Sequence, residues 1–105
     1  MFILNSTKTT AYVICIFTFD PTADGMSAAK YDEVIKRLKA ACQGNPKGRL
    51  YHVCYGEPND MRITDVWDTM ENFEAFGKTF IPILKEMEVD PGQPQIKPVH
   101  NIIKG

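Results

Sequence analysis

The two histidines of the chain are its clearest candidates for acid–base chemistry. The sequence contains only His52 and His100, and each falls in the middle of a stretch with the composition of a β-strand. An imidazole changes its charge near neutral pH, so two histidines that converge in one cavity could transfer protons. The alternative for each is a histidine at a contact between strands or subunits, satisfied by hydrogen bonds. We treat both as candidate catalytic residues.

Asp65 is the third candidate catalytic residue. It is expected to share one strand face with Ile63 and Trp67, because residues two apart point to the same side of a strand. A carboxylate buried on that face needs a partner or a raised pKa, and such groups beside a cavity are candidate bases. The alternative is that Asp65 is hydrogen-bonded to a residue of a neighbouring strand and has no catalytic role.

The sequence predicts neither a metal site nor a cofactor. Two histidines without a third ligand argue poorly for a metal, although a carboxylate from Asp65 or Glu57 could complete a site. No Ser–His–Asp order, glycine-rich phosphate loop or setting for a nucleophilic cysteine is present. Gly44 and Gly48 enclose Pro46 and belong to a loop.

Aromatic side chains are the candidate ligand-binding residues. They lie in the predicted strands and along one helix, and they are Tyr12, Tyr55, Trp67, Phe76 and Phe80. Trp67 could form the wall of a site for a flat ligand, and the tyrosines could orient a ligand hydroxyl or carbonyl. The alternatives are a packed core or interface for Trp67, core edges for the tyrosines, and ordinary core for the phenylalanines, which recur at helical spacing.

The pattern of apolar residues predicts four strands and two helices in the order β-α-β-β-α-β. The strands are expected at residues 11–19, 49–55, 61–68 and 95–103, and the helices between the first and second and the third and fourth of them. The simplest packing for this order is ferredoxin-like, with a four-stranded antiparallel sheet and both helices on one face. The fold class is therefore α+β.

Cap residues and a proline mark the predicted helix boundaries. Ser27 is the expected N-cap of the first helix, whose apolar face includes Cys42 and which should end at Gly44. The second helix is expected to begin at Asp68 or Thr69. Because proline is costly inside a helix, Pro82 predicts a kink or a break near Phe80.

Length and charge limit the domain organisation and the partners. The chain has 105 residues and a net charge of −1, which fits residues 1–10 as a loose extension and 11–105 as one domain. Without a basic face, nucleic acid is an unexpected partner. No apolar run approaches the ~20 residues that span a membrane. The odd count of three cysteines indicates small core residues in a reducing cytoplasm.

Two predicted strands are apolar on both faces, which points to a homodimer. The first places Ile14 and Ile16 on one side and Cys15 and Phe17 on the other. The second places Leu50, His52 and Cys54 opposite Tyr51, Val53 and Tyr55. Two helices can cover only one sheet face, so pairing of two sheets would bury the other. Coverage by the terminal segments is the alternative.

Short motifs spread over residues 11–103 carry a resemblance to a known superfamily. They are Gly25-Met26-Ser27 with Tyr31-Asp32, Gly48-Arg49-Leu50-Tyr51-His52-Val53, Asp65-Val66-Trp67-Asp68 with Phe73 and Phe76, Ile81-Pro82-Ile83-Leu84, and Pro98-Val99-His100-Asn101. With them the chain resembles the dimeric α+β barrel superfamily, near its antibiotic-biosynthesis-monooxygenase-like group. The resemblance implies that two sheets enclose a barrel with a ligand cavity.

The resemblance also bears on cofactors. It implies that Trp67 lines the pocket, as a tryptophan ending the third strand does in members that oxidise aromatic substrates or degrade haem. Those members often carry a histidine nine or ten residues later, where this chain has Phe76 and Gly77. The resemblance therefore does not extend to haem ligation.

Two functions follow as hypotheses. The first is a cytoplasmic homodimer that binds a small apolar or aromatic molecule and performs cofactor-independent oxygenation or isomerisation. The second is a non-enzymatic dimeric module with a filled core.

Overall fold

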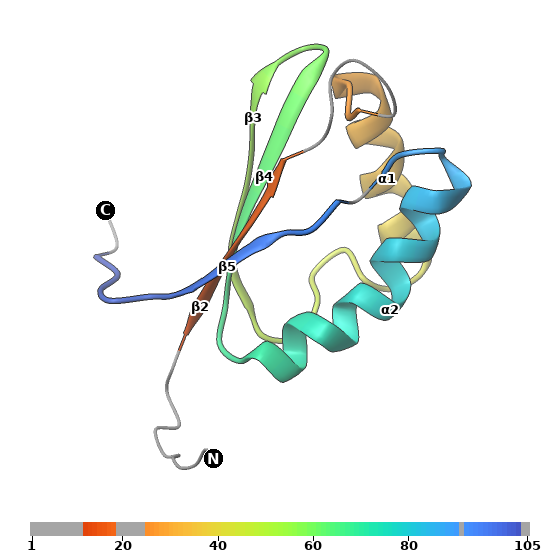
Figure 1. Cartoon of the computed structure of the whole chain (residues 1–105). Coiled ribbons are helices and arrows are strands. Elements are labelled where there is room, and N and C mark those ends of the chain that lie inside the picture. The colour runs from red at the N-terminus through yellow and green to blue at the C-terminus, as the bar shows by residue number, and fades with distance from the viewer. Residues whose placement is uncertain (1–11, 19–24, 91, 104–105) are drawn as a thin grey trace.

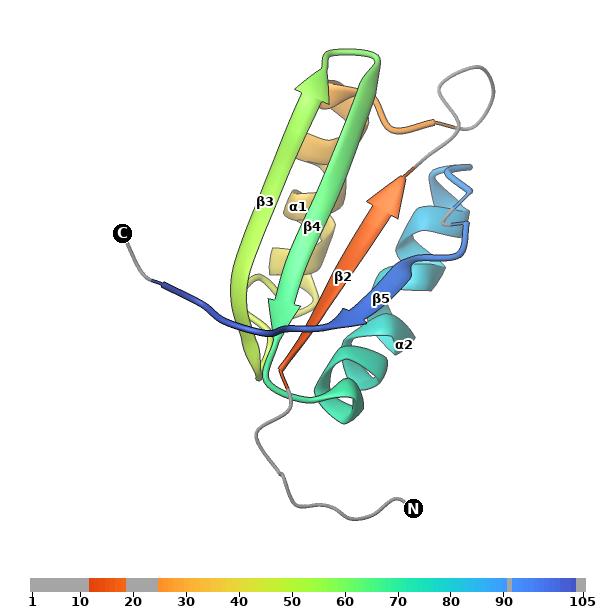
Figure 2. The same cartoon turned by 60° about the vertical axis from the view of Figure 1, so that its left-hand side comes forward.

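The computed structural model describes residues 12–18, 25–90 and 92–103. Within them the elements follow one another as β2 (Val13–Thr18), α1 (Ala28–Ala40), β3 (Arg49–Glu57), β4 (Asp60–Trp67), α2 (Met70–Glu86) and β5 (Gln95–Pro98). The strands form one antiparallel sheet in the order β3-β4-β2-β5. Both helices cover the same face of this sheet, as Figure 1 and Figure 2 show. The predicted ferredoxin-like α+β fold is confirmed.

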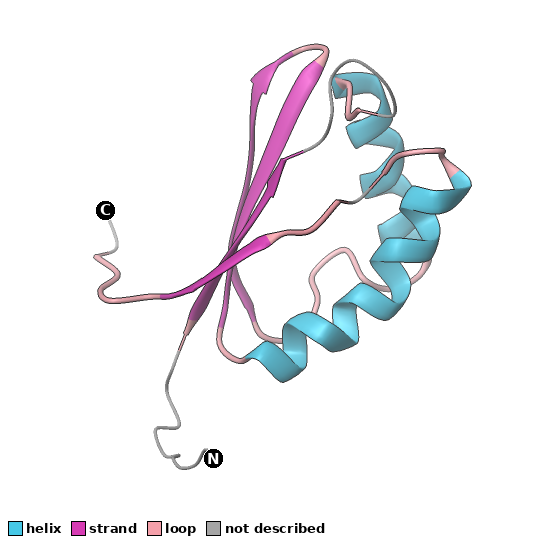
Figure 3. Ribbon diagram, viewed as in Figure 1, coloured by secondary structure: helices cyan, strands magenta, loops and turns pink. Residues whose placement is uncertain are grey.

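Figure 3 shows the helices and the sheet as two layers. The buried side chains of both layers form one hydrophobic core. The register of β2 against β4 pairs Val13 with Trp67, Cys15 with Asp65 and Phe17 with Ile63, and all six side chains are buried. The intervening residues of β2 point to the other face and are only partly buried. The period-two pattern of the sequence is therefore realised as two distinct sheet faces.

The helix-free face carries a set of large apolar side chains. Tyr51, Val53 and Tyr55 of β3 are exposed by 36%, 52% and 42%. Leu50 joins Tyr51 on this face, where both line a hollow with Tyr12. Its predicted place beside His52 is wrong, because a β-bulge between Arg49 and Tyr51 shifts the alternation by one residue.

Helix α1 begins as predicted and ends earlier. The Ser27 hydroxyl accepts a hydrogen bond from the Lys30 N–H at 3.1 Å. Cys42 takes the left-handed conformation with φ 62°, and the Gln43 N–H donates to the Leu38 carbonyl at 2.7 Å. This closing geometry ends the helix before Gly44, the predicted terminus. It also turns Cys42 to the surface, so its predicted place in the core is wrong.

Helix α2 runs through its proline without a break. The Thr69 hydroxyl accepts a hydrogen bond from the Asn72 N–H at 3.1 Å and caps the N-terminus. Pro82 lies on the exposed side of the helix, while Phe80, Ile83 and Leu84 are buried around it. Burial of these side chains on both sides of Pro82 offsets the cost of the lost hydrogen bond, so the predicted break is wrong.

Strand β5 is shorter than predicted. It ends at Pro98, and the Val99 N–H donates to the Tyr12 carbonyl at 2.9 Å. Among the described strands it pairs with β2, and this pairing ends at Val13. Residues 99–103 lie outside the strand, so His100 is in a loop and its predicted place within a strand is wrong. Neither helix is long and apolar enough to cross a membrane.

Candidate functional site

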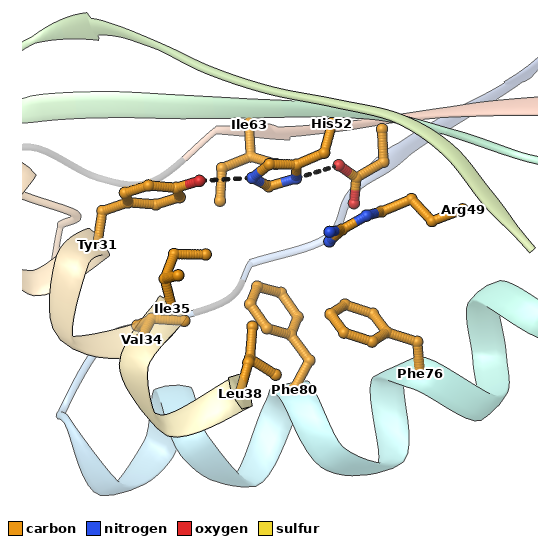
Figure 4. A pocket seen from close by; sticks show the side chains of 10 residues that line it. Tyr31, Val34, Ile35, Leu38, Arg49, His52, Ile63, Phe76 and Phe80 are labelled. Atoms are coloured by element: carbon orange, nitrogen blue, oxygen red, sulfur yellow. Dashed lines mark hydrogen bonds and ion pairs between the residues drawn. The ribbon is translucent and has the colours of Figure 1, made fainter. Parts of the chain in front are cut away.

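Three side chains from separate elements form a continuous hydrogen-bonded chain under the sheet (Figure 4). The Tyr31 hydroxyl lies 2.6 Å from His52 Nε2, and His52 Nδ1 lies 2.6 Å from Asp65 Oδ1. The rings of Tyr31 and His52 are nearly parallel, with 11° between their planes. His52 therefore connects a phenol on α1 with a buried carboxylate on β4.

The chemistry of the two ends determines the direction of these hydrogen bonds. An ionised carboxylate only accepts, so His52 Nδ1 carries a hydrogen and donates it to Asp65. In the neutral ring Nε2 then accepts from the Tyr31 hydroxyl. When the ring is protonated, Nε2–H donates to the Tyr31 oxygen instead. The same distances thus suit both protonation states of His52, as a proton relay requires.

Secondary structure positions each of the three hydrogen-bonded side chains, Tyr31, His52 and Asp65. The β3–β4 register places His52 directly opposite Asp65, so their side chains emerge on the same face. Tyr31 lies on the inner side of α1, one turn before Val34 and Ile35. A two-residue turn links β3 to β4, and the Ala28 N–H donates to the Pro58 carbonyl in it at 2.7 Å. This contact anchors the start of α1 to the hairpin that carries His52 and Asp65.

The chain of hydrogen bonds opens onto a pocket between the sheet and the two helices. Its polar side chains are Tyr31, Arg49, His52 and Asp65, and the apolar ones are Val34, Ile35, Leu38, Ile63, Phe76 and Phe80. The space in it that admits water amounts to about 10 Å³, which is room for about one water molecule in this conformation.

Arg49 brings a positive charge to the pocket. Its guanidinium lies over the Phe76 ring, 5.9 Å from the centroid, and its Nη2 donates to the Gly44 carbonyl at 3.2 Å. Figure 4 shows the guanidinium reaching into the pocket above Phe76 and Phe80. None of the ion pairs found among the described residues includes Arg49. Its charge is therefore held in place by a neutral carbonyl and an aromatic face.

Burial changes the acidity of two groups around the site. It raises the pKa of the Tyr31 hydroxyl, and the charge of Asp65 acts in the same direction while Arg49 opposes it. Burial, followed by the charge of Asp65, raises the pKa of Cys15 to about 12. Tyr31 and Cys15 are therefore both held in their neutral forms at neutral pH.

Four of the predicted site residues meet at this pocket. His52, Asp65, Phe76 and Phe80 all line it. Trp67 lies behind them, fully buried, with its ring 5.3 Å from that of Phe76. Its Nε1 is buried and has no hydrogen-bond partner among the described residues. Trp67 supports the pocket wall through Phe76 and does not line the pocket itself.

The other predicted site residues lie elsewhere. His100 is exposed and lines a surface hollow with Tyr12, Val99 and Asn101. The two histidines therefore do not converge on one pocket. Tyr55 is exposed on the helix-free face, where its hydroxyl lies 3.2 Å from Thr64 Oγ1. In the part of the chain that the structure describes, the pocket lined by His52 does not include His100, Tyr12 or Tyr55.

Tyr31 and Arg49 are site residues that the sequence analysis did not single out. Tyr31 falls on the apolar side of a predicted helix among Val34, Ile35 and Leu38. A tyrosine at such a position is a signal in itself, because a buried hydroxyl needs a partner. Arg49 offered no comparable signal, since its inward direction depends on the bulge that follows it.

The described residues hold no group of three or more His, Cys, Asp or Glu side chains that could bind a metal ion. The second histidine, which a metal site would have needed, lies in another part of the surface.

Comparison with known proteins finds solved structures with a similar fold. No protein-family model matches the sequence, and no curated protein matches it. A protein from Chloroflexus aurantiacus J-10-fl, provisionally named an antibiotic biosynthesis monooxygenase, superposes with a TM-score of 0.61 at 15% identity, over 90% of this chain and 98% of that one. A similarly named protein from Caulobacter crescentus CB15 gives 0.58 at 17% identity, over 90% and 93%.

A third structure carries an activity in its name. SnoaB from Streptomyces nogalater is a cofactor-independent oxygenase, and it superposes with a TM-score of 0.58 at 17% identity, over 90% of this chain and 96% of that one. Identities this low establish the fold alone. The chain therefore has the ferredoxin-like α+β fold of the antibiotic-biosynthesis-monooxygenase-like proteins.

Proposed function

We propose that this protein is an enzyme that removes a proton from a small apolar or aromatic molecule bound between the sheet and the helices. The observation that carries the proposal is the contact of His52 with both Tyr31 and Asp65, at 2.6 Å on each side. A histidine held between an acid and a phenol beside an apolar pocket is suited to general acid–base catalysis. The reaction we infer is a cofactor-independent oxygenation or an isomerisation.

The relay accounts for the proton in either reaction. A substrate proton passes to the Tyr31 oxygen while the Tyr31 proton moves to His52 Nε2. The products of this step are a substrate anion, a neutral Tyr31 and an imidazolium beside the Asp65 carboxylate. In an isomerisation the proton returns to a different carbon of the substrate. In an oxygenation the substrate carbanion supplies the two electrons for a new carbon–oxygen bond to O₂, and the resulting peroxide anion takes the relayed proton back from His52. Cleavage of the O–O bond with loss of water then leaves a carbonyl at that carbon. The likeness in fold to SnoaB supports this branch.

We further infer that two copies of the chain pair through their helix-free sheet faces. This face carries Tyr51, Val53 and Tyr55 on β3 and Ile14 and Ile16 on β2, none of them charged. The strand register also places Arg62 and Lys97 on this face, so the apolar side chains form a patch bordered by two cations. Such an apolar patch suits a second copy of itself, since a two-fold axis brings the same residues together. The three free cysteines are in keeping with the cytoplasmic location expected from the sequence.

One observation favours a second candidate function, a dimeric module without enzymatic activity. The pocket has room for about one water molecule in this conformation. Behind its wall, Trp67 packs against Phe73 and Phe76, with ring centroids 5.7 and 5.3 Å apart. If this packing persists in solution, the hydrogen bonds of His52 serve stability alone.

Exchange of carbon-bound hydrogen distinguishes the two candidates. In deuterated buffer an enzyme of the proposed kind accelerates deuterium uptake at the acidic α-carbon of 1-indanone, measured by proton NMR. The variant His52→Gln should lose this acceleration. His100→Gln, which removes the exposed histidine, should retain it. Oxygen consumption with 2-naphthol, followed by an electrode, tests the oxygenase branch.

Failure of wild-type protein to accelerate exchange or to consume oxygen contradicts the enzymatic proposal and leaves the dimeric module. Equal losses in His52→Gln and His100→Gln contradict the assignment of His52 as the reactive histidine.

A further inference from the structure

We propose that the ligand of this pocket carries an anionic group, such as a carboxylate, on its apolar or aromatic body, and that it enters past Phe76. This inference rests on the proposed function for the use of the pocket. It adds the entrance, the charge of the ligand and the direction in which the ligand lies.

The entrance is a second, outer groove that meets the pocket at one side chain. The groove is lined by Gln43, Pro46, Lys47, Asn72, Ala75 and Phe76, and the space in it that admits water amounts to about 120 Å³. Phe76 lines both this groove and the inner pocket. Its ring is 4% exposed and stacks on Phe80, with centroids 5.2 Å apart. Rotation of Phe76 would therefore join the two spaces.

Arg49 contributes positive charge to both the inner pocket and the outer groove. Its guanidinium lies inside the pocket over Phe76, and it donates to the carbonyl of Gly44, next to Gln43 in the wall of the outer groove. Lys47 adds a second positive charge in that wall. The described residues that line the groove include no carboxylate side chain. A ligand that approaches through it meets two cations before it reaches Asp65.

Charge complementarity then fixes the orientation of the ligand. A carboxylate pairs with Arg49, whose guanidinium has no ion-pair partner among the described residues and whose planar donors match two carboxylate oxygens. The apolar body then extends inward against Val34, Leu38 and Phe80. In this orientation the apolar body lies in the pocket that Tyr31 and His52 also line.

Phenylacetate and phenylacetamide form a matched pair of probes for this inference, because they share a shape and differ in charge. Phenylacetate should bind about tenfold more tightly than phenylacetamide, as expected for a charge-assisted pair in a partly desolvated site. Trp67 is the only tryptophan of the chain and contacts Phe76, so its fluorescence reports displacement of that ring. Titration calorimetry measures the same affinities independently.

Arg49→Gln should reduce the preference for phenylacetate to near unity. Arg62→Gln is the control, because it removes one positive charge from an exposed strand position paired with Asp60. Chemical-shift changes in wild-type protein, at the amides of Gly44 and Lys47 with phenylacetate, test the site without any substitution. Phe76→Leu should speed the association of phenylacetate, because the smaller side chain blocks less of the path from the groove to the pocket.

Equal affinity of the wild-type protein for the two probes, or binding of neither, overturns the inference. So does a loss of preference that is as large in Arg62→Gln as in Arg49→Gln. Binding of phenylacetamide without a gain for phenylacetate refutes the anionic ligand while the proposed pocket stands. Tight binding of phenylacetate without deuterium exchange into 1-indanone refutes the proposed catalysis and leaves this inference intact.

Discussion

His52 Nδ1 lies 2.6 Å from Asp65 Oδ1, on the neighbouring strand directly opposite. Asp65 is 2% exposed, so its charge has little solvent to stabilise it and depends on this partner. Because the carboxylate accepts from Nδ1, it holds the imidazole in the tautomer that leaves Nε2 free to accept from Tyr31. The cross-strand pair thus determines both the tautomer and the direction of His52.

Replacement of Asp65 by Asn should disturb the tautomer of His52. The ¹⁵N chemical shifts of the ring in wild-type protein should show a hydrogen on Nδ1, and in Asp65→Asn a mixture of tautomers. Proton-transfer activity should fall by about 10²- to 10⁴-fold, as for other histidines that lose an orienting carboxylate. Asp32→Asn, at an exposed helix position, is the control and should change neither. An unaltered tautomer in Asp65→Asn would contradict the assigned role.

Loss of the Tyr31 hydroxyl should destabilise the fold modestly. In Tyr31→Phe, His52 Nε2 loses its partner in a partly buried site, and the free energy of unfolding should fall by about 1 kcal/mol. The matched variant Tyr55→Phe removes a hydroxyl that is exposed in the single chain, with a 3.2 Å contact to Thr64, and at concentrations where the protein is monomeric it should cost less than about 0.5 kcal/mol. Urea unfolding measures both. A larger loss in Tyr55→Phe would contradict the burial argument.

Cys15 should make the fold less stable in alkali. Its folded pKa of about 12 lies above the ordinary value of 9.0, so its contribution is complete below pH 9 and is lost as the pH rises toward 12. In that window one proton changes the stability by about 1.4 kcal/mol per pH unit. Cys15→Ala should therefore show a shallower decline in urea unfolding between pH 9 and 11. Identical slopes in both proteins would be the contrary result.

Substitution of alanine for two glycines, Gly48 and Gly77, should change the stability of the fold in opposite directions. Gly48 has φ +88°, and a Cβ there would lie 2.4 Å from Asp68 Oδ1 and 2.5 Å from Asn72 Nδ2. Gly48→Ala should cost about 1–3 kcal/mol through strain and crowding at the start of α2. A Cβ at Gly77, inside α2, meets nothing within 4 Å. Gly77→Ala should instead stabilise by up to about 1 kcal/mol, and thermal unfolding of both variants checks the signs.

A charge on the helix-free face should separate the proposed dimer. Val53 is 52% exposed in the single chain and lies at the centre of the β3 apolar set. Val53→Glu would bury a carboxylate in the paired sheets, so light scattering should detect monomers. Lys36→Glu, an exposed position of α1, is the control and should remain dimeric. A wild-type protein that is monomeric at all concentrations refutes the pairing.

Patterns confined to one element were predicted well from the sequence. The alternation of Cys15 and Phe17 with Ile14 and Ile16 indicated the two sheet faces, because side chains alternate in any strand. The hydroxyl of Ser27 marked the start of α1 for an equally local reason. Local patterns were insufficient where contacts with other elements determine how far an element extends. Strand β5 ends at Pro98, opposite Val13 at the start of β2. Helix α2 continues past Pro82 because the side chains beside the proline are buried.

The sequence by itself determined the class of the fold, the order of its elements and the set of side chains able to transfer protons. Only the tertiary structure decided which of them meet. Tyr31 and His52 are 21 residues apart and touch because α1 packs against the β3–β4 hairpin, while His52 faces Asp65 because of the β3–β4 register. His100 lies elsewhere because β5 is short. Register and packing depend on contacts between distant residues, whose energies no local pattern contains.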